Sequence, residues 1–422
     1  MKTKRILILG GTTHANRGDL AMQAGLIQWL QREVPGAEIR MLASNPDLTR
    51  QVLGVPAFPS PDSWLATPWT RETPTSTSQR KRAIRKGRRF AIQTRLARWI
   101  PVAVHPSARE FASHLRWADA VFVPGSGSMN SLWWHDWLYP KAFTVLAAAV
   151  LRKPVFMTSQ GVGPAFSHAL DAAVAGRMFR ACRAVGVRDG EASGAILRSV
   201  GVDAGSILLT GDDALLFTSD AQALSRPHGK LVGVNLRDSS GYGKRYPKPE
   251  LEACATALRR VLQRDAAVKL VFIPISYDSH DDDRKSAAAV ASLIGLPERI
   301  TLITEELDAA QLRGTIAGMD VCLGVSYHFL LFALSSGVPC LGFWQNPYYQ
   351  QKLGGLFRLF EWEDQALDFS AGISENSQEL LADRLASLLE NRNRHHRMLA
   401  QRQSVIDSEC RAARNQILHR LA

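Results

Sequence analysis

The sequence has few cysteines, and their arrangement excludes two kinds of site. Five occur among 422 residues, no two of them form a C-x-x-C pair, and most lie in apolar surroundings. A disulfide framework needs several cysteines that can pair, and a cysteine zinc site needs closely spaced thiols. The sequence therefore predicts reduced thiols in a cytosolic enzyme, at Cys182, Cys254, Cys322, Cys340 and Cys410.

Long hydrophobic runs and several well-known catalytic motifs are also absent. No apolar run reaches the ~20 residues that a membrane-spanning helix requires. The basic residues 1–5 precede only four apolar ones, at 6–9, whereas a secretory signal needs ~7–15. G-x-G-x-x-G, Walker A, H-E-x-x-H and G-x-S-x-G patterns do not occur. We therefore expect a cytoplasmic protein that begins with a strand and does not bind a dinucleotide.

Acidic residues are missing from one segment, and this explains most of the charge. The net charge is +12, and residues 80–98 contain nine Lys or Arg and no Asp or Glu. Outside this segment the chain has 42 basic and 39 acidic residues, so the rest of the protein is nearly neutral. A protein that binds nucleic acid usually spreads basic residues over its folded domain, so nucleic acid is not an expected partner. Apolar residues alternate with the arginines at Phe90, Ile92, Leu96, Trp99 and Ile100. This pattern is typical of interfacial helices, and it predicts peripheral membrane contact through residues 80–100. The alternative is a solvated basic helix or a disordered arm.

Short apolar runs alternate with helical periodicity along both halves of the chain, which predicts an α/β fold with parallel strands. We expect a Rossmann-like domain over residues 1–217, with a basic insertion at about 60–105. A second Rossmann-like domain is expected over residues 230–375 and a helical segment over 376–422. Ligands of such sheets bind beyond the carboxyl ends of the strands, so we expect a cleft there. The predicted strands are 5–9, 38–43, 118–123, 154–158, 185–188 and 207–209, then 231–236, 269–275, 300–303, 321–324 and 340–343.

Two glycine-containing segments follow predicted strands and are candidate anion sites. In the first, Asn16, Gly18 and Asp19 precede a helix, whose N-terminus offers free N–H groups to an anion. The simpler interpretation is that Asp19 caps this helix. The second segment can form a phosphate-binding nest or a flexible turn, and its candidate residues are Gly125, Ser126, Gly127 and Asn130.

Three arginines are candidate contacts for a carboxylate or phosphate. Arg188 follows a strand and could clamp an anion or form an internal ion pair with Asp189 or a neighbour. Arg237 ends the first strand of the second half, and a structural role is equally compatible with its position. Arg245 lies in a polar loop, where it could also be a solvated charge. The acidic run at 281–283 precedes a helix and predicts capping rather than metal binding.

The most informative segment begins at Ser326, Tyr327 and His328. The histidine opens an apolar helix directly after a strand and is expected to face the cleft. A helix N-terminus lowers the pKa of an imidazole, which keeps the ring near neutral and able to exchange protons. A hydrogen-bonded structural histidine is the alternative.

Taken together, the sequence resembles the polysaccharide pyruvyl transferase family. The matching pieces occur in family order: residues 16–19, the turn at 125–130, residues 160–164, residues 187–189 with Ser193, and residues 327–328 with 337–339. The resemblance implies a two-domain fold similar to GT-B glycosyltransferases. It also implies transfer of the enolpyruvyl unit of phosphoenolpyruvate to two sugar hydroxyls as a cyclic ketal. Many members carry an arginine where this chain has Ser326, so Arg188, Arg237 or Arg245 would supply the charge, or the donor differs.

The implied chemistry assigns His328 and Asp19 to catalysis, with His328 transferring a proton or holding the departing phosphate. No metal or organic cofactor is required. The acceptor is expected to be a sugar of a cell-surface polysaccharide or of its lipid-linked precursor. One alternative is a GT-B-type glycosyltransferase that uses a nucleotide sugar. A second is a non-enzymatic protein that binds nucleic acid or an anionic surface through residues 80–98.

Overall fold

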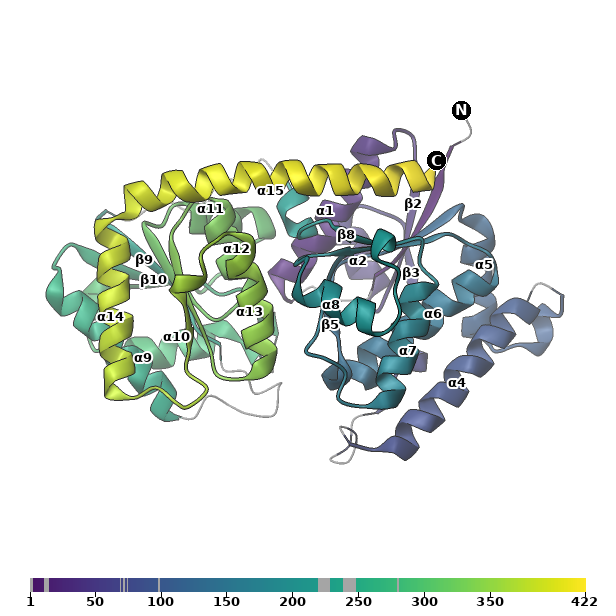
Figure 1. Ribbon diagram of the computed structural model, residues 1–422, viewed down its shortest axis with the longest axis horizontal. Coiled ribbons are helices and arrows are strands. Elements are labelled where there is room, and N and C mark those ends of the chain that lie inside the picture. The colour runs from purple at the N-terminus through teal and green to yellow at the C-terminus, as the bar shows by residue number, and fades with distance from the viewer. Residues whose placement is uncertain are drawn as a thin grey trace. The chain divides into compact units, whose positions relative to one another are not determined.

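The chain folds into two compact units, each of which is described by itself. The computed structural model describes residues 3–10, 15–68, 70, 73, 75–97, 99–218, 228–237, 248–278 and 281–422 (Figure 1). Unit 1 contains residues 1–14, 21–217 and 409–422, and unit 2 contains residues 15–20 and 218–408. The beginning of the first helix therefore belongs to unit 2, and the end of the last helix belongs to unit 1.

Unit 1 contains a parallel sheet whose strands run in the order β3-β2-β1-β4-β6-β7-β8, with β5 paired to β6. Its strands, in the described part of the chain, are β1 (Arg5–Leu9), β2 (Glu38–Ala43), β3 (Ala57–Pro59), β4 (Ala120–Val123), β5 (Ser126–Met129), β6 (Val155–Val162), β7 (Ala184–Val187) and β8 (Ile207–Leu209). Helices connect the strands: α1 (Arg17–Glu33), α2 (Pro46–Leu53), α3 (Asp62–Leu65), α4 (Thr77–Leu96), α5 (Pro106–Trp117), α6 (Tyr139–Val150), α7 (Ala169–Arg180) and α8 (Ala192–Ser199).

Both faces of this sheet are buried, as expected of parallel strands. Leu7 and Leu9 of β1 belong to one apolar cluster, which includes Phe90 and Phe111. Ile6 and Ile8 belong to the opposite cluster, which contains side chains from α1 and from the end of the last helix. The period-two alternation of β1 thus divides its side chains between two helical layers.

Unit 2 contains a second parallel sheet in the order β13-β10-β9-β14-β15-β16. Its strands are β9 (Lys230–Asn235), β10 (Val268–Phe272), β13 (Ile300–Leu302), β14 (Val321–Gly324), β15 (Cys340–Trp344) and β16 (Ala366–Asp368), beside a small hairpin of β11 (Tyr277–Asp278) and β12 (Asp281–Asp282). The helices are α9 (Lys248–Arg264), α10 (Asp283–Ile294), α11 (Ala309–Ala317), α12 (Tyr327–Ser335), α13 (Pro347–Leu359), α14 (Glu375–Glu390) and α15 (Arg392–Leu421). Two mostly parallel sheets confirm the predicted α/β class.

The basic segment is part of the core of unit 1. Its helix α4 packs against α5 and α6, and Phe90 on its inner face is fully buried. The Ser76 hydroxyl caps the helix by accepting a hydrogen bond from the amide of Gln79 at 3.2 Å. Of the alternatives left open by the sequence, the disordered arm is therefore wrong for residues 77–96.

Further features bear on the sequence-based expectations. The helical segment expected over residues 376–422 consists of two helices, because α14 ends at Glu390 and α15 begins at Arg392. All five cysteines are buried, and burial raises the pKa of Cys182, Cys322 and Cys340. Within the described ranges, no helix combines the length and apolar character needed to cross a membrane.

Candidate functional site

The N-terminus of α1 is held within unit 2. The Asn16 side chain accepts hydrogen bonds from the amides of Gly18 at 3.1 Å and Asp19 at 3.3 Å. The backbone on either side is fixed as well, because Arg17 donates to Ile275 O and Tyr277 donates to Ala15 O, both at 3.0 Å. Asn16 is thus the capping residue, and the interpretation of Asp19 as the cap is wrong. Asp19 lies in the first turn of α1, where a carboxylate suits the helix dipole.

Gly18 lies directly against the imidazole of His328. A Cβ atom built on Gly18 would lie 2.0 Å from His328 Cγ and 2.1 Å from its Nδ1. A glycine is therefore required at this position for close approach rather than for backbone freedom. His328 itself is buried in the first turn of α12. Its ring contacts the rings of Tyr327 and Phe332, at centroid distances of 5.3 and 6.3 Å. These contacts bring together the two motifs that the sequence places about 310 residues apart.

A buried arginine lies just beyond the carboxyl end of β9. Arg237 Nε donates to Asp283 Oδ1 at 3.0 Å and lies 3.4 Å from Asp281 Oδ2. Burial alone would lower the pKa of Arg237, but the carboxylates of Asp283 and Asp281 hold it well above the ordinary value. Its Nη2 atom is buried and has no hydrogen-bond acceptor among the described residues. Asp283 and Asp281 therefore hold the Nε edge of the guanidinium, and none of the described residues accepts from the Nη2 donor on its other edge.

Asp283 organises this region of unit 2. Its Oδ2 accepts from the amides of Ile275 and Ser276 at 2.8 and 3.0 Å, and from Asn235 Nδ2 at 3.0 Å. Ser276 also pairs with Asn16 in an isolated bridge. The acidic run was predicted to cap a helix, and Asp282 does cap α10. Asp283 instead holds Arg237, and its place before a helix does not predict this role.

Three further groups lie at or near the start of α12. Ser326 is buried and occupies the N-cap position, without a side-chain hydrogen bond to the helix. Tyr327 is also buried, and Lys352 Nζ of α13 lies 5.5 Å from the centroid of its ring. The sequence analysis missed Lys352, because a lysine in an ordinary helical pattern carries no motif. The candidate residues in unit 2 are thus Asn16, Gly18, Asp19, Arg237, Ser326, Tyr327 and His328; Arg245 lies outside the described residues.

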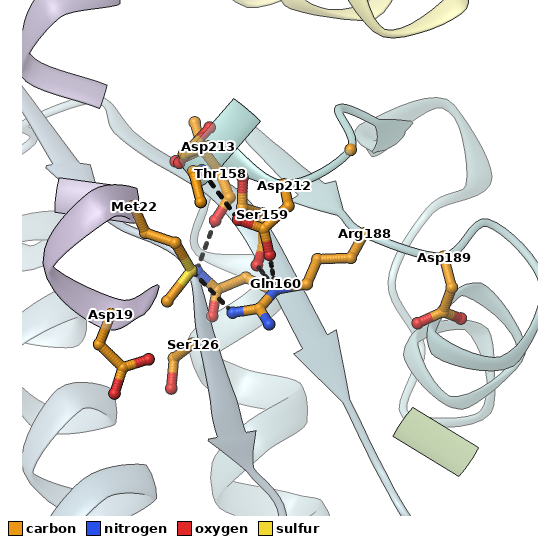
Figure 2. Close-up of polar contacts among 12 residues, drawn as sticks. Asp19, Met22, Ser126, Thr158, Ser159, Gln160, Arg188, Asp189, Asp212 and Asp213 are labelled. Atoms are coloured by element: carbon orange, nitrogen blue, oxygen red, sulfur yellow. Dashed lines mark hydrogen bonds and ion pairs between the residues drawn. The ribbon is translucent and has the colours of Figure 1, made fainter. Parts of the chain in front are cut away.

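A second polar cluster lies at the carboxyl ends of β6, β7 and β8 in unit 1 (Figure 2). Arg188 Nε donates to Ser159 O at 2.7 Å and lies 3.0 Å from Asp212 Oδ2. Its Nη2 lies 2.9 Å from Met22 Sδ. Arg188 therefore makes the internal ion pair that was one of its two interpretations. The partner is Asp212 rather than Asp189, whose carboxylate accepts from the amide and hydroxyl of Ser193.

The backbone of this cluster is strained at Ser159. Its φ is +54°, in the left-handed region that non-glycine residues rarely adopt. The Thr210 hydroxyl accepts from the Ser159 amide at 3.1 Å and stabilises this conformation. Gly125 packs so closely that a Cβ there would lie 2.7 Å from Ser159 Cβ. Such strain is often found at functional sites. Beside it, burial raises the pKa of Asp213, which accepts from the Thr158 hydroxyl at 2.5 Å.

The serine-rich turn forms a short strand, β5, rather than an open loop. The Ser126 hydroxyl accepts from the amide of Ser128 at 3.0 Å. Asn130 is buried and donates to Gly163 O at 2.9 Å, while its carbonyl oxygen accepts from the amide of Leu132 at 3.0 Å. Asn130 thus has a structural role in this conformation. Unit 1 therefore contains Gly125, Ser126, Gly127, Asn130 and Arg188, and their contact with a substrate stays a prediction.

The residues that the structure describes contain no group of three or more His, Cys, Asp or Glu side chains arranged to hold a metal ion.

Two parallel α/β sheets, with polar side chains at their carboxyl ends, define a GT-B-like protein. Solved structures of this class are similar over nearly the whole chain. They include UDP-GlcNAc 2-epimerase from Neisseria meningitidis bound to UDP-GlcNAc, with a TM-score of 0.53 and 12% identity, covering 96% of this chain and 98% of that one. The glycosyltransferase of kitacinnamycin has a TM-score of 0.58 and 13% identity, and the match covers 100% of both chains. HepE from Anabaena in complex with UDP has a TM-score of 0.57 and 13% identity, and the match covers 99% of both chains. At these identities the likeness shows the fold.

The chain belongs to the polysaccharide pyruvyl transferase family, whose model matches residues 16–347. Among curated proteins it is similar to the amylovoran biosynthesis protein AmsJ of Erwinia amylovora. The two are 22% identical over 370 residues, which cover 84% of this chain and 86% of that protein. Family membership makes the chain a transferase that acts on a polysaccharide.

Proposed function

We propose that this chain transfers the pyruvyl group of phosphoenolpyruvate to two hydroxyls of a saccharide, as a cyclic ketal, in exopolysaccharide biosynthesis. Family membership supports the reaction class, and the naming of AmsJ as a biosynthesis protein of amylovoran supports the process. The observation that carries the proposal is that a buried arginine and a buried histidine follow two neighbouring strands, β9 and β14, at the carboxyl edge of one sheet. Arg237 has a buried Nη2 donor with no acceptor among the described residues, and His328 lies in the first turn of the helix after β14.

The proposed roles follow from the charges of the donor. Phosphoenolpyruvate carries a carboxylate and a phosphate, and a guanidinium binds either group through directed hydrogen bonds. Arg237 would take the place of the family arginine that Ser326 replaces. Because Asp283 already fixes its Nε edge, the guanidinium is oriented before the donor arrives, which reduces the entropy cost of binding.

In the proposed reaction, His328 donates a proton to the methylene carbon of the donor, which becomes a methyl group. A first sugar hydroxyl attacks the central carbon and gives its proton to the now neutral His328 ring, which restores the acid. The bond between that carbon and the phosphate oxygen then breaks, and phosphate leaves with the electron pair. A second hydroxyl attacks the same carbon and closes the ketal, and the departing phosphate takes up its proton. This scheme requires neither a metal nor an organic cofactor.

Thermal unfolding with each candidate donor tests the proposal. A ligand at 100 times its Kd stabilises a protein by ~2.7 kcal/mol, which is readily measured. We expect phosphoenolpyruvate to raise the Tm and a panel of nucleotide sugars to leave it unchanged. The reverse result would support a nucleotide-sugar glycosyltransferase instead.

Two variants of Arg237 separate binding from folding. Arg237→Lys keeps the positive charge beside Asp283 but lacks the second edge of the guanidinium, so it should fold and lose most of the stabilisation by phosphoenolpyruvate. Arg237→Gln should lose it completely. Arg264→Gln is the matched control, because Arg264 of the same unit also pairs with carboxylates, those of Glu379 and Asp383. Its response to phosphoenolpyruvate should equal that of the wild type.

The role of His328 is tested by phosphate release from phosphoenolpyruvate in the presence of an oligosaccharide panel. A positioned acid contributes ~10²–10⁴-fold to the rate. His328→Gln should therefore lower kcat by about that factor while the variant still binds phosphoenolpyruvate. A loss of less than about tenfold would exclude His328 as the acid.

A further inference from the structure

Helix α4 presents a strongly basic face to solvent. Its inner face is buried and includes Ala83, Gly87 and Phe90. The opposite face carries no acidic residue and displays six exposed cations, which are Lys81, Arg82, Arg85, Arg88, Arg89 and Arg95. At 3.6 residues per turn these positions share one side of the helix with Ile92 and Leu96.

The helix becomes apolar at its carboxyl end, and the turn that follows it is apolar as well. Ile92 is 60% exposed, Trp99 is 73% exposed and Val102 is 89% exposed. Leu96 and Ile100 between them are also exposed. Exposed apolar side chains gathered in one place mark interaction sites on soluble proteins. We call the six exposed basic residues of α4 and these five apolar residues the docking surface.

The docking surface is rigid because α4 is tightly packed in unit 1. A Cβ on Gly87 would lie 2.0 Å from Phe143 Cδ2 of α6, so the two helices are in close contact. Arg80 of α4 donates through Nε and Nη2 to Asp171 of α7, each at 2.9 Å. Figure 1 shows α4 at the outer side of its unit, beyond α6 and α7. The orientation of the outward face is therefore fixed by the fold.

We propose that the docking surface binds an anionic lipid bilayer. The arginines and lysine match the negative charge of phosphate head groups, and the apolar end enters the boundary between head groups and acyl chains. Nucleic acid would match the cations but leaves Trp99, Ile100 and Val102 without a function. Tryptophan is suited to this interface because its ring is amphipathic. The inference rests on the proposed function and deepens it, because an enzyme bound to the membrane surface would reach a lipid-linked saccharide acceptor.

Flotation with lipid vesicles tests the proposal directly. We expect the full chain to float with phosphatidylcholine vesicles that contain about one-third phosphatidylglycerol, and roughly tenfold less with pure phosphatidylcholine. Salt should weaken the binding only in part, because apolar contacts are not screened. Equal recovery with both vesicle types, or none with either, would overturn the proposal.

Matched variants locate the contact. Trp99→Ser combined with Val102→Ser should reduce flotation by roughly tenfold, whereas Val150→Ser combined with Val405→Ser, two exposed valines elsewhere, should not. The triple change Arg85→Gln, Arg88→Gln and Arg89→Gln should abolish the preference for anionic vesicles. Its control is Arg177→Gln, Arg198→Gln and Arg411→Gln, which removes the same charge from other exposed positions of unit 1. If both members of either pair behave alike, the docking surface is not the contact.

Further measurements distinguish the failure of this inference from that of the proposed function. Stabilisation by phosphoenolpyruvate should be the same in the serine and glutamine variants as in the wild type, because none of the substituted residues lies at the candidate donor site. Loss of flotation with retained stabilisation by phosphoenolpyruvate assigns the surface to lipid. Flotation without such stabilisation leaves the surface assigned and refutes the donor. Binding of an RNA duplex that the arginine variants lose and the Trp99 and Val102 variants retain, without flotation, would favour nucleic acid instead.

Discussion

Close approach at single residues determines the geometry of the candidate site. Gly18 allows α1 and α12 to meet at the imidazole of His328, and Gly125 allows β5 to pack against the left-handed Ser159. In both places a missing Cβ, rather than an added functional group, makes the arrangement possible. The residues that a sequence motif displays are thus of two kinds, those that could contact substrate and those that make room for them.

Substituting Gly18 tests this interpretation. In Gly18→Ala the new methyl group would overlap the His328 ring, so either α1 or the imidazole must move by more than 1 Å. Displacement on this scale costs about 10²-fold in rate, and we expect phosphate release to fall by that factor. The control is Gly354→Ala in α13, where a Cβ meets no atom within 4 Å. That change should keep full activity and stabilise the helix by about 0.5–1 kcal/mol. Equal activities of the two variants would contradict the close contact.

Buried His114 should make the stability of the protein depend on pH. The centroid of its ring lies 4.5 Å from that of Phe58. Burial, together with the nearby charge of Arg40, lowers its pKa from 6.5 to about 4. The unfolded chain therefore takes up this proton first as the pH falls. The contribution of the neutral, buried imidazole to the free energy of unfolding is therefore complete above pH 6.5. It is lost between pH 6.5 and 4, by at most about 3 kcal/mol.

Urea unfolding at pH 7 and pH 4.5 measures this effect. His114→Leu removes the titrating group, so the difference in free energy of unfolding between the two pH values should shrink. His419→Gln, at an exposed histidine of the same unit, should leave the difference at the wild-type value. An unchanged difference in His114→Leu would show that other groups cause the acid sensitivity.

At the scale of elements, α4 shows how a segment of unusual composition joins a core. The charge of residues 80–98 predicts solvent exposure, and most of the arginines are exposed. Among the described arginines of this segment Arg80 is the exception, because Asp171 accepts hydrogen bonds from its Nε and Nη2 and also accepts one from the Tyr139 hydroxyl at 2.8 Å. Burial and the Asp171 carboxylate raise the pKa of that tyrosine. This buried network connects α4, α6 and α7.

Breaking the network should destabilise unit 1. Asp171→Asn leaves a buried guanidinium without its counter-charge, a change that costs about 3–5 kcal/mol. Chemical denaturation should show this loss in the transition of unit 1. Asp47→Asn, which breaks the exposed pair with Arg50, should cost less than about 1 kcal/mol. A loss of that smaller size for Asp171→Asn would mean that the buried pair does not hold α4 to the core.

At the scale of the whole molecule, the last helix belongs to both units. Residues 392–408 of α15 lie in unit 2 and residues 409–422 in unit 1. Ile417 and Leu421 join the apolar cluster of Ile6 and Leu208, while Arg420 donates to Arg183 O at 2.9 Å and Gly205 O at 2.8 Å. The carboxyl end of the chain therefore completes the fold of the N-terminal half.

This assignment predicts a localised effect. Ile417→Ala removes a fully buried side chain and should destabilise unit 1 by about 2–5 kcal/mol. Hydrogen exchange should become faster in peptides from β1 and β8 and stay unchanged in those from β9 and β14. Met398→Ala, at an exposed position of the same helix, should change neither set. Faster exchange in unit 2 would contradict the division of α15.

The strands and helices could be predicted well where the local pattern suffices. The predicted strands at 5–9, 38–43, 207–209 and 321–324 agree with β1, β2, β8 and β14, because buried parallel strands are short runs of apolar residues. The two-residue strands β11 and β12 were not predicted, since segments of this length carry no periodicity. The side-chain partners were predicted less well. Arg188 pairs with Asp212, a residue 24 positions later, and no spacing rule connects the two.

The sequence by itself determined the α/β class, the alternation of its elements and the family motifs, because hydrophobic periodicity and turn chemistry are local properties of the chain. Only the tertiary structure decided which polar groups face one another. It places Gly18 against His328 and Asp283 beside Arg237, and it buries Arg80 while its neighbours stay exposed. The physical reason is that electrostatic and packing interactions depend on distance in space, which strand order and helix packing set after the local structure has formed.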